Sequence, residues 1–259
     1  EKSINSFKSK DKNFLSLNIN PTQKIILIKI EKIQNSTEIE KIGAKFFNYI
    51  KSNSIFDVTI FNNNIKETSN KNTNFLDEFL HGAKLKSYNF DKYKSKRKNE
   101  VFNINISSDK KPLALDHNKR FDSLLEGTNL TKDLVSEPGN VLHPDEYARR
   151  LKQLTKYGLK VVVYDKNKLK KLGMNALLGV GQGSIRGSYL VTIEWNGSKS
   201  KDKPLAFVGK GVCFDTGGIS LKPAKFMEDM TYDMAGSAVV VGLMKSLALR
   251  NAKINAVGV

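Results

Sequence analysis

The residues best suited to chemistry lie in the stretch VGKGVCFDTGGISLKP, residues 208–223. An apolar run over 205–208 leads into it and has the composition of a buried strand. Lys210, Asp215 and Lys222 then follow, separated by glycines that let the backbone approach a bound group. In an open α/β sheet, ligands bind beyond the carboxyl ends of the strands, so these side chains stand where a site is expected.

A second carboxylate, Asp233, lies in TYDMAGSA at the start of the next predicted helix. Two aspartates and a lysine could hold a hard divalent cation, provided that the lysine amine is deprotonated, and clustered divalent charge would lower its pKa. A phosphate site is disfavoured because the spacing is not that of a P-loop and the aspartates would repel an anion. The residues alone leave a further alternative open, which is a structural salt bridge between Lys210 and Asp215.

The elements that position these residues alternate between strands and helices. Helices are predicted at 120–136, after His143-Pro144, at 167–172 and at 235–249, and strands at 159–164, 188–195, 204–209 and 254–259. Such alternation predicts an α/β catalytic domain with a mainly parallel sheet.

The first part of the chain predicts a separate α/β domain. Strands are expected at 25–30, 56–61 and 101–106, a loop at 62–74, and helices beginning near residues 39 and 75. Thr37 and Glu40 fit a capping box at the start of the first of these helices. The polar segment 107–118 marks the expected boundary, so the predicted domains span 1–115 and 119–259.

Composition excludes several classes of protein. With 39% hydrophobic residues in 259, the chain can bury a core, and it contains no run of about 18 apolar residues that would predict a membrane span. Its single cysteine, Cys213, excludes a disulfide framework and a Cys-rich zinc module. The apolar neighbours of Cys213 predict a buried neutral thiol. The absence of a signal-peptide pattern favours a cytoplasmic location.

The net charge of +17, from 43 Lys and Arg against 26 Asp and Glu, raises the question of a nucleic-acid partner. The excess is mostly lysine spread along the chain together with many Asn and Ile, which is typical of a compositional bias. The one dense cluster, residues 92–98, is interpreted as an exposed connector. A nucleic-acid partner is therefore not expected, although it remains the alternative reading of the charge.

The stretch 208–223, followed by MEDMTYDMAGSA at 227–238, resembles the catalytic core of the leucyl aminopeptidases, the cytosol aminopeptidase family. The resemblance covers roughly residues 75–259 and runs through LHGAKLKSYNFDKYKSK, TKDLVSEPGNVLHP and LGMNALLGVGQGS. The first 70 residues match only as a divergent N-terminal domain. The family consists of homohexameric metallopeptidases that release N-terminal residues, preferably apolar ones, from peptides. Two divalent ions, Mn²⁺ or Zn²⁺, activate the attacking water.

Where the residues of this sequence match those of the family motif, the resemblance implies a role for each of them. Lys210, Asp215 and Asp233 would be metal ligands, with Asp215 bridging both ions. Lys222 would be the catalytic lysine that polarises the scissile carbonyl and stabilises the gem-diolate. Met230 would line the pocket for the N-terminal side chain.

The chain departs from the family pattern in one respect. The family's remaining ligands, an aspartate and a glutamate, lie in an NTDAEGR motif that also carries a catalytic arginine, and this motif does not occur in the sequence. The chain also begins with Glu and ends on the apolar run 254–259. We therefore expect a truncated catalytic domain that is inactive alone. A nucleic-acid-binding protein and a non-catalytic homologue remain as alternatives.

Overall fold

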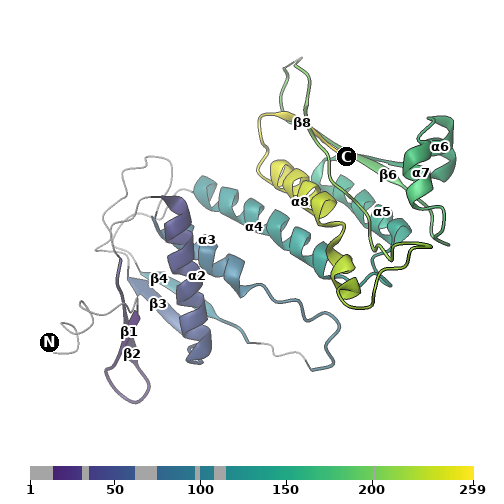
Figure 1. Ribbon diagram of the computed structural model, residues 1–259. Helices are drawn as coiled ribbons and strands as arrows, with labels where there is room; N and C mark the ends of the chain where they lie inside the picture. The colour runs from purple at the N-terminus through teal and green to yellow at the C-terminus, as the bar shows by residue number, and fades with distance from the viewer. Residues whose placement is uncertain (1–13, 31–34, 62–74, 97–99, 108–114, 201) are drawn as a thin grey trace. The chain divides into compact units, whose positions relative to one another are not determined.

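The computed structural model describes residues 14–30, 35–61, 75–96, 100–107, 115–200 and 202–259. The chain divides into two compact units, residues 1–117 and 118–259, and each has its own hydrophobic core. Figure 1 shows the helices and strands of both units with the labels used below.

The first unit packs two helices against two small sheets. The helices are α2 (Ser36–Ser52) and α3 (Phe75–Ser87). One sheet pairs β1 (Phe14–Asn18) antiparallel with β2 (Lys24–Ile28), and the other pairs β3 (Asp57–Phe61) parallel with β4 (Asn103–Ser107). The buried core is Ile39, Phe46, Phe47, Ile50, Phe75, Phe79 and Ala83.

Two features of the first unit differ from the sequence prediction. Strand β1 was not predicted, because the lysines, serines and asparagines around FLSLN mask its short alternation. The capping-box prediction at Thr37 and Glu40 was wrong. Helix α2 begins at Ser36, and the side chain of Asn35 accepts a hydrogen bond from the Glu38 amide at 3.1 Å. Asparagine ranks above threonine as an N-cap, so the helix begins earlier. The predicted loop 62–74 lies outside the described residues.

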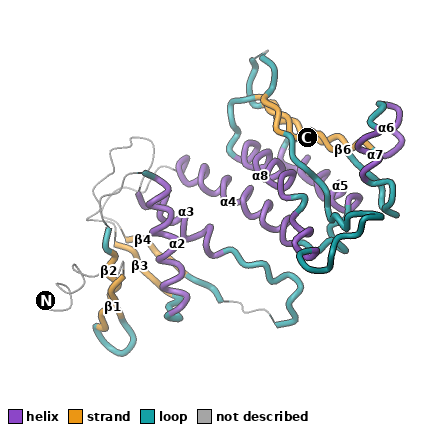
Figure 2. The backbone as a smooth tube through the Cα atoms, in the orientation of Figure 1, coloured by secondary structure: helices purple, strands orange, loops and turns teal. Residues whose placement is uncertain are grey.

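The second unit is built around a four-stranded sheet in the order β5-β6-β8-β7. Its strands are β5 (Lys160–Tyr164), β6 (Leu190–Asn196), β7 (Leu205–Phe207) and β8 (Asn255–Gly258). Its helices are α4 (Leu115–Ser136), which begins three residues before the unit boundary, α5 (Pro144–Lys152), α6 (Lys166–Lys171), α7 (Asn175–Val180) and α8 (Ala235–Leu249), with 3-10 turns η1 (Gln153–Tyr157) and η2 (Met227–Tyr232). Helices α5 and α8 lie along one side of the sheet, and α6 and α7 lie at one end of it (Figure 2).

This sheet is mixed, whereas the alternating pattern predicted a mainly parallel one. Among the described strands, β6 runs antiparallel to both β5 and β8, and β7 is parallel to β8. A parallel pairing needs a crossover connection. The segment from β5 to β6 makes none, because α6 and α7 stay at one end of the sheet and the chain returns from that end (Figure 2). The α/β class itself is confirmed.

Helix α8 forms the centre of the second core. Met234, Ala238 and Met244 are fully buried, and the sheet contributes Ile193 and Ala256 to the same cluster. By length and composition alone, Met227–Leu249 would suffice to cross a membrane, since an 18-residue window within it has a mean hydropathy of 1.2. However, 56% of this window is buried inside the unit, as a core helix is, and it includes the separate turn η2. We therefore interpret the segment as a core element.

Helices α4 and α8 cross at two glycines. A Cβ atom on Gly127 would lie 2.3 Å from the carbonyl oxygen of Gly242, and a Cβ on Gly242 would lie 2.5 Å from the carbonyl oxygen of Gly127. The hydroxyl of Thr131 donates to the carbonyl of Ala238 at 3.0 Å across the same contact. The two backbones can approach this closely only because neither crossing residue has a side chain.

Gly127→Ala is expected to destabilise the second unit by about 1–3 kcal/mol, because the added methyl group meets backbone atoms that cannot move independently. Gly179→Ala is the matched control, since no atom lies within 4 Å of a Cβ built on this α7 residue. The control should be neutral or slightly stabilising, by up to about 1 kcal/mol. Urea unfolding followed by the fluorescence of Trp195, the single tryptophan, measures both variants in this unit. Equal midpoints for the two variants would contradict the close crossing.

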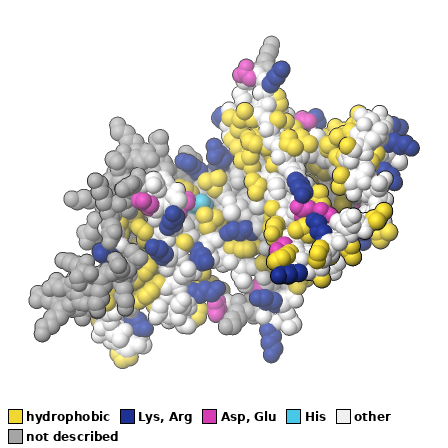
Figure 3. All heavy atoms as spheres, in the orientation of Figure 1, with side chains coloured by type: hydrophobic (Ala, Val, Ile, Leu, Met, Phe, Trp, Pro, Cys, Tyr) yellow, Lys and Arg dark blue, Asp and Glu magenta, His cyan; other side chains and the backbone are white. Residues whose placement is uncertain are grey.

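Positive charge is spread over the surface that Figure 3 shows. Lys and Arg side chains there are scattered over several elements rather than gathered in one patch. Within the predicted connector, Lys92, Lys94 and Lys96 are exposed. The view is compatible with a compositional origin of the charge, and the expected lack of a nucleic-acid partner stays a prediction.

Candidate active site

Backbone contacts hold the segment after β7 against the residue that follows β8 and against the start of α8. The amide of Gly209 donates to the carbonyl of Val259 at 2.9 Å, and the amide of Ser237 donates to the carbonyl of Lys210 at 3.0 Å. A Cβ on Gly209 would lie 2.5 Å from the Cα of Ser237 and 2.6 Å from the carbonyl oxygen of Gly236. Glycine is therefore required at 209 for Lys210 to reach the beginning of α8.

This packing brings Lys210 and Asp233 together. The Lys210 Nζ lies 2.6 Å from Asp233 Oδ1. The alternative that the sequence left open, a salt bridge between Lys210 and Asp215, named the wrong carboxylate. Lys210 pairs instead with Asp233, which lies 23 positions further along the chain. The reason is that the Ser237 amide holds the Lys210 backbone at the start of α8, shortly after Asp233.

Asp215 pairs with the second lysine of the motif. A tight turn returns the chain through Gly217 and Gly218, whose φ angles are 91° and 78°, and the Lys222 amide closes it onto the Thr216 carbonyl at 2.9 Å. The Lys222 Nζ then donates to Asp215 Oδ2 at 2.9 Å, and the other carboxylate oxygen accepts from the Gly217 amide at 2.8 Å. Glycines suit both turn positions because positive φ is strained for other residues.

The two pairs belong to one electrostatic environment. The pKa of Asp215 is lowered, first by the hydrogen bond from Lys222, then by the Gly217 amide, and in smaller part by the charge of Lys210. Lys222 also contacts Met230, with 3.1 Å between Nζ and the thioether sulfur. Lys210, Asp215, Lys222, Asp233 and Met230, all predicted from the sequence, thus gather beyond β7 and before α8.

The donor set fits part of a metal site. Asp233 is mostly buried, and its Oδ2 has no hydrogen-bond partner among the described residues. A buried carboxylate oxygen without a donor is unfavourable, and a cation at that oxygen would compensate it. Carboxylates and a neutral amine suit a divalent ion. In the part of the chain that the structure describes, no three His, Cys, Asp or Glu side chains converge on one point, so the set is incomplete.

Cys213, which lies between Lys210 and Asp215 in the sequence, is buried, as its apolar neighbours predicted. The thiol is 7% exposed, and burial, followed by the charge of Asp145, raises its pKa to about 12. At neutral pH the thiol is protonated and is therefore a core residue rather than an activated nucleophile.

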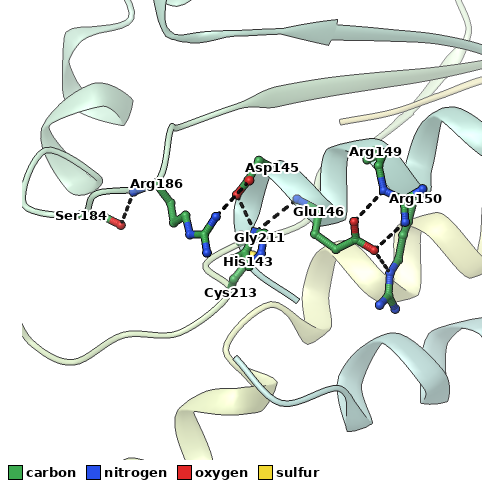
Figure 4. A network of polar contacts seen from close by, with 9 residues as sticks. All are labelled: His143, Asp145, Glu146, Arg149, Arg150, Ser184, Arg186, Gly211 and Cys213. Carbon is green, nitrogen blue, oxygen red and sulfur yellow. Dashed lines mark hydrogen bonds and ion pairs between the residues drawn. The ribbon is translucent and has the colours of Figure 1, made fainter. Parts of the chain in front are cut away.

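A polar network that sequence reasoning missed lies beside this segment, at the start of α5 (Figure 4). Asp145 contacts His143 Nδ1 at 2.5 Å with one oxygen and Arg186 Nη1 at 3.3 Å with the other. His143 occupies the N-cap position of α5, whose first residue is Pro144. Its Nδ1 lies 3.4 Å from the Glu146 amide, but the shorter contact with Asp145 requires a proton on Nδ1, so the cap contact adds little. Arg186 is 41 residues away in sequence, and no local pattern links it to Asp145.

Glu146, the next residue along α5, joins two arginines. It accepts from Arg149 at 2.6 and 2.7 Å and from Arg150 at 2.7 Å, and Arg150 also donates to Glu137 at 2.7 Å. The hydrogen bonds from Arg149 and then Arg150 lower the pKa of Glu146 to about 2. This cluster fastens α5 to the end of α4.

The lowered pKa of Glu146 predicts a pH dependence of stability. The contribution of the carboxylate is complete above its ordinary pKa of 4.5 and is lost as the pH falls toward about 2. Glu146→Gln should therefore cost about 1 kcal/mol at pH 7, the upper part of the range for such partly exposed pairs, and less at pH 3. Urea midpoints of the wild type and the variant at both pH values measure this. A difference that stays constant with pH would exclude the assigned pairing.

Comparison with known proteins decides the family. The model "Cytosol aminopeptidase family, N-terminal domain" matches residues 3–97, and "Cytosol aminopeptidase family, catalytic domain" matches residues 129–259. The chain belongs to the cytosol aminopeptidase family. The resemblance inferred from the motif after β7 is thereby confirmed.

The curated relatives that this chain matches in the cytosol aminopeptidase family are longer than the chain itself. A "Probable cytosol aminopeptidase" of Brucella melitensis is 43% identical over 246 residues, which is 92% of this chain and 50% of the relative. The chain thus spans about half the length of such curated relatives.

Solved structures share the fold. The crystal structure of a cytosol aminopeptidase from Coxiella burnetii has a TM-score of 0.62 and 27% identity, covering 71% of this chain and 38% of that one. The bottromycin maturation enzyme BotP in complex with Mn has a TM-score of 0.79 at 22% identity, covering 95% of this chain and 52% of that one. At that identity the second likeness shows the fold alone.

Proposed function

We propose that this chain carries part of the active site of a metal-dependent aminopeptidase that removes N-terminal residues, preferably apolar ones, from peptides. The observation that carries the proposal is the paired arrangement of Lys210 with Asp233 and Lys222 with Asp215 beyond β7. Membership of the cytosol aminopeptidase family supports it. Homohexamer formation and a cytoplasmic location belong to the same proposal.

Lys210, Asp215 and Asp233 would hold two divalent metal ions together with the aspartate and glutamate of the family motif that does not occur in this sequence. When bound, the ions would supply Lewis acidity and activate a water molecule. Asp233 would hold metal with the oxygen that has no donor among its described neighbours, and Asp215 would hold metal with the carboxylate whose Oδ2 accepts from Lys222. Manganese and zinc are the first ions to test, and the Mn complex of BotP motivates starting with manganese.

Lys222 would act on the substrate as a cation. Its ammonium group is half-buried and is already held by Asp215 and by the sulfur of Met230. A fixed positive charge beside the scissile carbonyl would stabilise the oxygen as negative charge develops on it. Met230 would contact the N-terminal side chain of the peptide, because a flexible thioether adapts to apolar groups of different shape.

The test uses the protein expressed from its complete open reading frame. After dialysis against Mn²⁺ or Zn²⁺, elemental analysis should find two ions per chain, and leucyl amide should be hydrolysed. N-acetyl-leucyl amide is the control and should resist cleavage, because an aminopeptidase requires a free amine. Cleavage of the blocked substrate would contradict the exopeptidase assignment. Metal uptake without hydrolysis would favour the non-catalytic homologue.

A further inference from the structure

Ser237 contacts the backbone on both sides of the Lys210–Asp233 pair. It is the third residue of α8, and the first four amides of a helix have no partner within the helix. The Ser237 amide donates instead to the carbonyl of Lys210 at 3.0 Å. Its hydroxyl donates to the carbonyl of Met234 at 2.8 Å, and Met234 directly follows Asp233. One residue therefore connects the two segments that carry the pair.

The Ser237 hydroxyl oxygen is held by Tyr147. The two hydroxyl oxygens lie 3.0 Å apart, and Tyr147, from α5, is 5% exposed. A serine hydroxyl has one proton, and a carbonyl oxygen can only accept. The Ser237 proton is therefore used on Met234, so Tyr147 must be the donor to Ser237. Without the tyrosine hydroxyl, Ser237 would lose a buried donor.

Lys210 needs this support because little else restrains its side chain. The side chain of Lys210 is 59% exposed, whereas that of Asp233 is 17% exposed. Its Nζ nevertheless lies 2.6 Å from Asp233, so its position must be set mainly through its backbone. Among the backbone contacts of this segment, the hydrogen bond from the Ser237 amide to the Lys210 carbonyl joins Lys210 itself to α8.

We propose that Tyr147 and Ser237 are positioning residues that set the separation of Lys210 from Asp233. The consequence for the backbone follows from the geometry alone. The consequence for metal binding rests on the proposed function, because it requires Lys210 and Asp233 to be ligands of one ion.

The variants that test this are Tyr147→Phe and Ser237→Ala, each of which removes one hydroxyl. Tyr157→Phe is the matched control, since its ring packs against the same core and contacts Lys245 instead. Amide hydrogen exchange of Ser237 should accelerate about 3- to 10-fold in both test variants, as expected for the loss of one buried hydrogen bond. The control should leave it unchanged, and the Ile193 amide on β6 should be unaffected in all three variants.

The second readout is metal affinity of the protein expressed from its complete open reading frame. Mn²⁺ should bind about 3- to 10-fold more weakly to Tyr147→Phe, while kcat at saturating Mn²⁺ stays within about twofold of the wild type. Unchanged Ser237 exchange, or faster exchange with unchanged Mn²⁺ affinity, would overturn the inference. If the wild type binds no Mn²⁺, the proposed function fails, and the exchange measurement alone decides the positioning role.

Discussion

Replacing Lys222 with alanine is expected to lower the turnover of leucyl amide by about 100- to 1000-fold, the usual cost of losing one electrostatic stabiliser of a developing oxyanion. Metal content should remain unchanged, because Lys222 contacts Asp215 as a cation rather than serving as a ligand. The measurement is kcat together with elemental analysis, on the protein expressed from its complete open reading frame.

Lys225→Ala is the control for this change. Lys225 lies three residues further on, and its Nζ lies over the ring of Phe226 at 5.0 Å from the centroid. Its removal should leave turnover within about twofold of the wild type. If both variants lose activity equally, the loss comes from general positive charge near the site, and the specific role of Lys222 is wrong.

Lys210→Arg is expected to abolish binding of one metal ion although the positive charge is retained. An arginine side chain stays protonated, with a pKa of about 12.5 or higher, and offers no lone pair to a metal. The fold should survive, since a guanidinium can still pair with Asp233, which Lys210 contacts at 2.6 Å. Metal stoichiometry and thermal unfolding of the same preparation separate the two effects.

Lys160→Arg is the matched control, because Lys160 forms a comparable pair with Glu194 at 3.0 Å outside the site. It should keep full metal content and activity. Asp215→Ala should also lose metal, since Asp215 is proposed to bridge both ions. If Lys210→Arg keeps two ions and full activity, Lys210 is only the ion-pair partner of Asp233.

Much of the local structure could be predicted because it depends on residues close together in sequence. The apolar composition of α8, the His143-Pro144 start of α5 and the Gly173 stop after α6 are encoded within a few positions. The motif after β7 likewise indicated the family and the residues of the candidate site. The failures at this level were β1 and the Asn35 cap, where weak or competing local signals decide the outcome.

The pairing of side chains could not be predicted because it depends on contacts between distant segments. Lys210 and Asp215 are neighbours in sequence, yet Lys210 pairs with Asp233, since the glycine-lined contact between the segment after β7 and α8 brings that carboxylate closer. The mixed sheet follows from which end of the sheet the β5–β6 connection occupies. The sequence by itself thus determined which residues are proposed to carry the chemistry. Only the tertiary structure decided which lysine pairs with which carboxylate, because packing between elements sets the distances between those side chains. The contacts of Tyr147 and Ser237 beside the Lys210–Asp233 pair likewise depend on tertiary packing.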